Sequence, residues 1–308
     1  MLLSCFIPRE VSMLFVQVVL PVFLIVFSGF VLEKSSRLDF RTLTITSLYL
    51  LAPALVFSAL MKRDFDLSLA GDLFLFMVLY TAILYALSRG LAALLGFDDE
   101  SRGALLLTTV MMNVGNFGLP LTYFAFGEAA LEISVLTFVL FNIPLGTLAI
   151  VIAQGSRSSL PTALGNMAKI PIFHAVILAF FFKWLGWHPP EFILRPLDLL
   201  GQAAIPLMLV MLGMQLARTQ WQSRVGFFSL ATAVRLGVAP ILAWGLTAVL
   251  GIEGLTRAVL ILQTSTPSAV LPLLYALRFG GRPDLVAGTI LTTTLISAVT
   301  LTILLYLL

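Results

Sequence analysis

Charged residues are scarce in this sequence of 308 residues, at 11%, whereas hydrophobic residues make up 60%. A soluble domain carries about 25% charged and about 45–50% apolar residues. Because an aqueous protein of this size has no core large enough for so many apolar residues, the sequence predicts a protein that lies in the lipid bilayer. A spanning segment has to satisfy its own backbone hydrogen bonds there, which predicts helices of roughly 20 residues.

Residues that form disulfides or bind metals are also few. The sequence has one cysteine, Cys5, and two histidines, His174 and His188. These numbers exclude an intramolecular disulfide framework and argue against a metal centre, so we predict no metal and no cofactor. The net charge of +3 is small and gives no sign of a nucleic-acid partner. The first apolar run, Val11 to Leu32, is too long for the core of a cleavable signal peptide.

Ten apolar segments separated by short polar connectors predict an all-α membrane protein with ten transmembrane helices. The segments are residues 11–32, 42–61, 73–96, 103–126, 131–153, 166–186, 193–217, 225–250, 255–279 and 285–308. The longest connector, residues 154–165, separates a first five-helix repeat, residues 1–153, from a second, residues 166–308. Because five is an odd number, the second repeat would enter the membrane from the opposite side, so the repeats are expected to be inverted.

Prolines support this repeat. The first, second and fourth segments of each half contain one, in the pairs Pro21 and Pro171, Pro53 and Pro206, and Pro120 and Pro272. We interpret Pro53 and Pro206 as helix kinks. Inverted repeats are a frequent plan for secondary transporters, whose substrate site lies where the repeats meet.

The orientation follows from the basic residues near the segment ends. The connectors after the first, third, fifth, seventh and ninth segments hold more Lys and Arg than the others, and include Lys34, Arg102 and Arg157. Connectors rich in Lys and Arg face the cytoplasm. We therefore predict a multi-pass protein of the cell inner (plasma) membrane with a cytoplasmic central connector and both termini outside.

The fourth segment contains a helix-breaking cluster at its centre. Asn113, Gly115, Asn116, Gly118 and Pro120 lie within the string NVGNFGLP. Glycines weaken a helix, and Pro120 has no N–H to donate to the carbonyl of Asn116. Free backbone groups at this depth are tolerated only where they face protein or a water-filled cavity.

The ninth segment, which is the fourth of the second half, has a matching polar interruption. Its members are Gln263, Thr264, Ser265, Thr266, Pro267, Ser268 and Pro272. Paired interruptions at corresponding positions of two repeats indicate the binding site of a transporter. Half-helices that begin at the crossing of these two segments would present free N–H groups and partial positive charge, which suit an anion. The alternative is a pair of proline-kinked helices whose small residues serve close packing.

Three further polar residues lie within apolar segments. Arg235, in the eighth segment, would attract an anionic substrate or brace the polar interior; the alternative is that it snorkels to the interface. Asn142 in the fifth segment adds to the candidate cavity wall, with helix packing as the blander role. His174 is better explained as a hydrogen-bonded structural histidine than as a proton carrier. We include Arg235 and Asn142 with the two interruptions as candidate substrate-binding residues.

The strings NVGNFGLP and TPSAVLP, with the ten-segment layout and the length, resemble the auxin efflux carrier family. That family includes bacterial organic-acid carriers and the plant PIN-FORMED proteins, and the chain looks like the compact bacterial form. The resemblance implies a scaffold of helices 1, 2, 6 and 7, and a transport domain of helices 3–5 and 8–10 with crossing broken helices 4 and 9. It also implies elevator-type alternating access for a small organic anion, either a dicarboxylate or an auxin-like carboxylate. By this resemblance Asn113, Pro120, Pro267 and Pro272 would line the crossing, and relatives often form homodimers.

The fold also resembles the bile acid sodium symporters, which use a membrane-embedded glutamate for sodium. The corresponding region here offers Gln263 and hydroxyl groups but no carboxylate. Sodium coupling through a carboxylate is therefore not expected, while potential-driven and facilitated transport both stay open.

Three classes of function remain to be compared. A secondary transporter fits best, and an anion channel or passive sensor on the same fold is the alternative. An intramembrane enzyme is disfavoured because the sequence has no HExxH or GxSxG motif and no clear aspartate within a span.

Overall fold

The computed structural model describes residues 8–36, 38–62, 67–155, 165, 170–219 and 224–308. Every regular element in these ranges is a helix, as the composition predicts. Seven helices of the described chain are long and apolar enough to cross a membrane. The arrangement as ten spans in two inverted repeats stays a prediction, and most of the central connector 154–165 lies outside the described residues.

The first half of the chain builds its helices in this order: α1 (Arg9–Leu14), η1 (Phe15–Val19), α2 (Leu20–Ser36), α3 (Phe40–Thr46), η2 (Ser47–Leu51), α4 (Ala52–Met61), α5 (Leu67–Leu94), α6 (Asp99–Thr109), η3 (Val114–Gly118), α7 (Leu119–Phe126), η4 (Gly127–Ala130), α8 (Leu131–Gly146) and α9 (Leu148–Gln154). The second half follows with α11 (Pro171–Trp184), α12 (Glu191–Arg218), α13 (Val225–Ala233), η6 (Val234–Val238), α14 (Ala239–Val249), α15 (Gly254–Thr264), α16 (Leu271–Phe279) and α17 (Pro283–Leu307).

Four of these elements, η1, η2, η3 and η6, are single π-helical turns, and each ends two residues before a proline. The prolines are Pro21, Pro53, Pro120 and Pro240. A proline ring clashes with the carbonyl four residues earlier and cannot donate to it, so the preceding turn widens. The kink predicted at Pro53 takes this form, whereas Pro206 lies inside the continuous helix α12.

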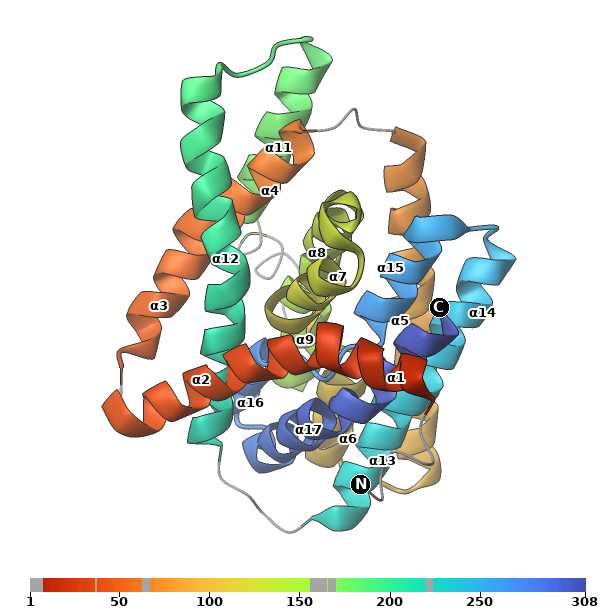
Figure 1. The fold of residues 1–308 in the computed structure, drawn as a ribbon. Coiled ribbons are helices and arrows are strands. Elements are labelled where there is room, and N and C mark those ends of the chain that lie inside the picture. The colour runs from red at the N-terminus through yellow and green to blue at the C-terminus, as the bar shows by residue number, and fades with distance from the viewer. Residues whose placement is uncertain (1–7, 37, 63–66, 156–164, 166–169, 220–223) are drawn as a thin grey trace.

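Helices α2, α4, α11 and α12 form one tightly packed group, on the left of Figure 1. Two glycines bring α2 and α12 into backbone contact: a Cβ on Gly213 would lie 1.8 Å from the carbonyl oxygen of Val26, and one on Gly29 would lie 2.1 Å from that of Val210. Small residues allow such close approach of helices within a membrane. At one end of this helix pair, the mostly buried Glu33 of α2 forms a salt bridge with Arg218 of α12, with Oε1 of Glu33 2.8 Å from Nε of Arg218.

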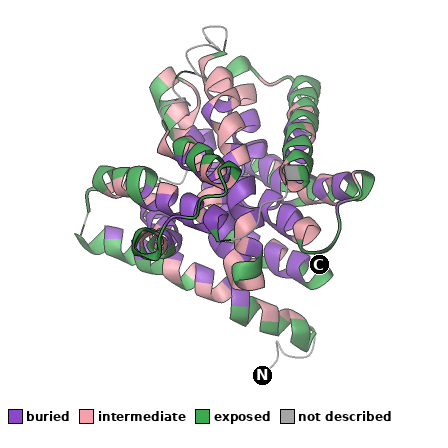
Figure 2. Ribbon diagram, turned by 90° about the horizontal axis from the view of Figure 1, so that it is seen from above, coloured by how far each residue is buried: buried purple, intermediate pink, exposed green. Residues whose placement is uncertain are grey.

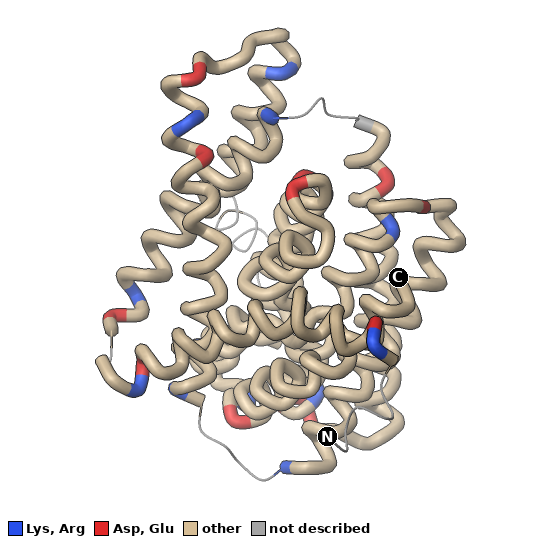
Figure 3. Tube along the Cα trace, viewed as in Figure 1, with Lys and Arg blue, Asp and Glu red and all other residues tan. Residues whose placement is uncertain are grey.

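The remaining helices surround α7 and α8 at the centre of Figure 1, with α5, α14 and α15 on the opposite side from α12. Figure 2 shows buried residues concentrated in the middle of the molecule and exposed ones around it. In Figure 3 most charged residues lie near helix ends, which leaves long uncharged stretches between them. Helix α6, which leads into the centre, is capped by Asp98, the residue before it, whose Oδ1 accepts from the Ser101 N–H at 2.7 Å. This bond lowers the pKa of Asp98.

Candidate functional site

Both interruptions expected from the sequence are present. Helix α6 ends at Thr109 and the chain becomes helical again only at Val114. Helix α15 ends at Thr264 and helix α16 begins at Leu271. Residues 110–113 and 265–270 between these ends are called the crossing below.

The two stretches of the crossing are joined by backbone hydrogen bonds. Met112 and Ser268 form an antiparallel bridge. The Asn113 N–H donates to the carbonyl of Pro267 at 2.9 Å, and the Ala269 N–H donates to that of Met111 at 2.8 Å. Backbone groups that each helix leaves unpaired within the apolar interior are therefore satisfied by the other chain segment, as burial requires.

The side chain of Arg235 connects the ends of the two half-helices that lead into the crossing. It is fully buried on η6. Its Nη1 donates to the carbonyl of Thr109 at 2.7 Å, and its Nη2 donates to the carbonyl of Thr264. These are the last residues of α6 and α15, so one guanidinium binds both carboxyl-terminal ends.

Tyr80 of α5 completes this cluster. Its hydroxyl donates to the carbonyl of Thr264 at 2.9 Å and accepts from Nη2 of Arg235 at 2.9 Å. The carboxyl end of a helix carries about −0.5 elementary charge, so two such ends offset a charge of about +1. A buried arginine is costly unless it is compensated, and here the two helix ends provide the compensation.

The amino-terminal ends of the other two half-helices also lie at the crossing. The half-helix of η3 and α7 begins directly after Asn113, and α16 begins at Leu271. Their first N–H groups have no acceptor within the helix, and each end carries about +0.5 elementary charge. Gly115, Asn116 and Leu271 are only partly buried, unlike the enclosed residues around Arg235. The positive helix ends are therefore the less enclosed side of the crossing.

Two amide side chains at the crossing retain unpaired polar atoms. Nδ2 of Asn113 and Oε1 of Gln263 are buried and have no hydrogen-bond partner among the described residues. The other amide atom of Gln263, Nε2, donates to the carbonyl of Ser134 at 3.2 Å. A buried unpaired donor or acceptor costs about 1–3 kcal/mol, which makes these atoms candidates for contact with a ligand.

The hydroxyl groups of the ninth segment have a different use. The four hydroxyls of the interruption each donate to a main-chain carbonyl, and Ser268 Oγ reaches across to that of Thr108 at 2.6 Å. The corresponding acceptors are Leu260 for Thr264, Ile261 for Ser265 and Gln263 for Thr266. Since these protons satisfy carbonyls near the break, they are not free to bind an anion. The amide of Asn113 and the helix N–H groups fit that role better.

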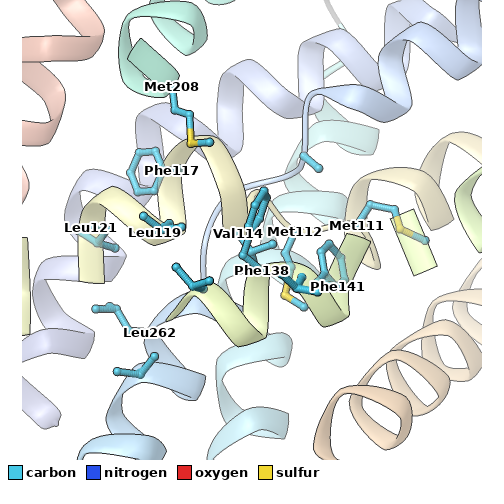
Figure 4. Close-up of a cluster of buried hydrophobic side chains, with 14 of the residues drawn as sticks. Met111, Met112, Val114, Phe117, Leu119, Leu121, Phe138, Phe141, Met208 and Leu262 are labelled. Carbon is cyan, nitrogen blue, oxygen red and sulfur yellow. The ribbon is translucent and has the colours of Figure 1, made fainter. Parts of the chain in front are cut away.

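The glycines of the fourth segment allow close packing at the crossing. A Cβ on Gly115 would lie 2.6 Å from the ring of Phe138, and one on Gly118 would lie 3.2 Å from the Thr266 methyl group. Pro272 lies in the first turn of α16, where a missing N–H costs nothing. Pro120 instead lies in α7, which continues directly from the widened turn η3, so only Asn113 of the predicted cluster lies in the break and Gly115, Asn116, Gly118 and Pro120 are helical. Figure 4 shows the buried apolar side chains nearby, which include Met111, Met112, Val114, Phe117, Phe138, Phe141, Met208 and Leu262.

Of the three further polar residues singled out in the sequence, Arg235 belongs to this network, whereas Asn142 and His174 bond within their own helices. The snorkelling alternative for Arg235 is wrong, because its side chain has no exposure. Asn142 donates to the carbonyl of Phe138 at 2.7 Å, within its own helix. His174 is exposed, and its Nδ1 lies 3.2 Å from the carbonyl oxygen of Ile170, as a structural role predicts. Cys5 lies outside the described residues.

A cavity of about 320 Å³ separates the group of α2, α4 and α12 from α7, η4 and α8. Its polar lining includes Ser58, Lys62, Tyr123, Glu128, Asp198 and Gln202. Lys62, at the end of α4, and Asp198 of α12 form an ion pair at 2.6 Å on the same side of this cavity. Tyr123 and Phe124 of α7 line this cavity, so it lies along the half-helix of η3 and α7 that begins at the crossing.

Sequence reasoning missed the residues that reach the crossing from other helices. Tyr80, Ser134 and Thr293 each bond to the interrupted segments, and Thr293 Oγ1 accepts from the Ser268 N–H at 3.2 Å. The only signal would have been a polar group within an apolar segment, and the sequence has many of these.

Bilayer-length apolar helices, with two interrupted helices that meet in the interior, are features of membrane transport proteins. A comparison with protein families agrees: the family described as membrane transport protein matches residues 156–305. A protein of Methanothermobacter thermautotrophicus named as an uncharacterized transporter is 30% identical over 301 residues, which cover 92% of this chain and 95% of the relative. The chain therefore belongs to this family, the auxin efflux carrier family that its motifs resemble.

Two further relatives have similar coverage. A protein of Methanocaldococcus jannaschii, also named as an uncharacterized transporter, is 29% identical over 262 residues, 81% of this chain and 83% of the relative. A protein of Rhizobium meliloti provisionally named a malonate transporter is 28% identical over 270 residues, 84% of each.

Proposed function

We propose that the protein is a secondary transporter of a small organic anion and that the anion binds at the crossing. The observation that carries this proposal is the distribution of charge around the two breaks. Arg235 contributes about +1, the carboxyl-terminal helix ends together about −1, and the amino-terminal ends together about +1. The sum of about +1 matches one carboxylate group of a substrate.

In this proposal Asn113 is the principal side-chain ligand. Its Nδ2 is a buried donor without a partner, and it directly precedes the half-helix of η3 and α7. The N–H groups of Gly115 and Asn116 would add backbone donors, since the first turn of a helix leaves them free. Gln263 would donate the second N–H of its Nε2, which the bond to the Ser134 carbonyl holds in place, because its unpaired Oε1 is an acceptor and does not bind a carboxylate.

The mechanism that we propose is elevator-type alternating access between two inverted repeats, residues 1–153 and 166–308. The group of α2, α4, α11 and α12 would be the scaffold, because its glycine contacts make it rigid. The helices around the crossing would move against it along the cavity beside α7. A channel or passive sensor on this fold is the second candidate, and it would conduct without such a movement.

A small dicarboxylate is the substrate class that we favour over an auxin-like carboxylate. The name of the Rhizobium meliloti relative refers to malonate. One carboxylate would meet the helix ends and Asn113, and the second would meet solvent or the cavity. We further propose the inner (plasma) membrane as the location, with both termini outside, and a homodimer as the assembly.

Uptake into proteoliposomes tests this function. We expect saturable uptake of labelled malonate or succinate by the wild-type protein. The variant Asn113→Ala should fold normally and lose uptake, whereas Gln17→Ala, which removes an exposed amide of η1, should transport like the wild type. Unchanged uptake by the Asn113→Ala variant would contradict the proposed site.

Countertransport separates a carrier from a channel. A carrier preloaded with unlabelled dicarboxylate should take up the labelled anion faster, because the loaded site returns more readily. A channel would show no such stimulation, and that result would favour the second candidate.

A further inference from the structure

The positive charge that Arg235 brings to the crossing is attached to the chain and fully buried. Helices α6 and α15 both end at the crossing, and the carbonyls of their last residues have no partner within the helix and face the same buried position. Carbonyls at such ends, together with unwound backbone, are the groups that bind sodium in secondary transporters. Hard cations prefer oxygen ligands of this kind. In this chain the same two carbonyls, of Thr109 and Thr264, are bound by the guanidinium of Arg235.

We propose that Arg235 is a tethered cation that takes the place of a coupling sodium ion at the crossing. The partners of its two Nη atoms are two carbonyls and one hydroxyl, all formally neutral, so its charge is directed at the helix ends. Arginine stays protonated at any physiological pH, so this cation neither dissociates nor titrates. The helix ends are compensated permanently, and anion binding needs no dissolved cation.

A consequence is that transport does not depend on a sodium gradient. Only this consequence for transport rests on the proposed function. The binding of cations to the crossing can be measured on the purified protein without any substrate, so the two ideas can fail separately.

Removal of the guanidinium should create a cation site. In the variant Arg235→Gln the carbonyls of Thr109 and Thr264 and the hydroxyl of Tyr80 would surround an uncompensated space. We expect this variant to unfold at a lower temperature than the wild type in N-methylglucamine chloride. Sodium chloride at the same ionic strength should restore part of the loss in a saturable manner, since a ligand of the folded state stabilises it.

Two further variants serve as controls. Arg235→Lys keeps a tethered cation and should show no saturable response to sodium. Arg257→Gln removes a positive charge from α15, the helix that ends at Thr264, where the Arg257 guanidinium stacks on Trp244 with its carbon 5.2 Å from the ring centroid. The stability of this variant should respond equally to both salts, because Arg257 is not one of the groups that bind the carbonyls of Thr109 and Thr264.

The experiment is thermal unfolding of the full chain in detergent across a sodium titration at constant ionic strength. The inference is supported if only the Arg235→Gln variant gains a saturable shift of a few degrees. It is overturned if the wild-type protein already shows that shift, or if the Arg235→Gln variant behaves alike in both salts. Should that variant not fold in either salt, the wild-type and Arg235→Lys titrations still decide: a saturable sodium shift in either one overturns the inference.

Discussion

The hydroxyl group of Tyr80 offers a sharp test of the network at the crossing. The variant Tyr80→Phe removes one oxygen and leaves the ring, which stacks on Phe76 with centroids 5.7 Å apart. That oxygen both donates to the carbonyl of Thr264 and accepts from Arg235. All of these groups are buried, so water does not replace the lost bonds.

Loss of one partner from a buried polar pair costs about 1–3 kcal/mol. For a chain of this size we expect a fall in Tm of roughly 2–6 °C. Thermal unfolding in detergent, followed by tryptophan fluorescence, measures this change. The matched control is Tyr49→Phe, because Tyr49 is an exposed residue of η2 and its variant should unfold like the wild type. Equal Tm values for the two variants would refute the assigned role of Tyr80.

Two glycine variants separate packing of the scaffold from packing of the crossing. Gly213→Ala forces α12 away from the Val26 carbonyl and should lower the free energy of unfolding by about 1–3 kcal/mol or more. In the control Gly226→Ala, where a Cβ meets nothing within 4 Å, the free energy of unfolding should change little. Equal stability of the two variants would contradict the contact. Gly118→Ala places a methyl group 3.2 Å from Thr266 and should weaken anion uptake more than stability. Parallel uptake and unfolding assays measure the second effect, and a large loss of stability with normal uptake per folded molecule would contradict it.

The presence of a break in each of the two segments was predictable because glycine and proline disfavour a regular helix locally. The break at Pro267 lies where the sequence predicts it, whereas in the fourth segment the break is at residues 110–113, and Gly118 and Pro120 lie beyond it in η3 and α7. The expectation of meeting segments came from their matching places in the two halves. The backbone bonds between Asn113 and Pro267 agree with that expectation.

The partners of the break were not predictable, because they depend on contacts between distant parts of the chain. Arg235 was weighed as a substrate ligand, a brace or a snorkelling residue, and its position in sequence does not distinguish these. Its bonds to Thr109 and Thr264 depend on the packing of η6 against α6 and α15. The bond from the Ser268 hydroxyl to the carbonyl of Thr108 likewise depends on packing between distant parts of the chain, so the sequence does not predict it.

The central claim is that a carboxylate binds where the two interrupted helices meet. Anomalous scattering from crystals soaked with bromomalonate would locate the anion directly. We predict a bromine peak beside the amino-terminal end of η3, with a carboxylate within hydrogen-bond distance of Asn113 Nδ2, and no peak in crystals of the Asn113→Ala variant. A peak confined to the surface of α2, α4 or α12, away from the crossing, would contradict the account.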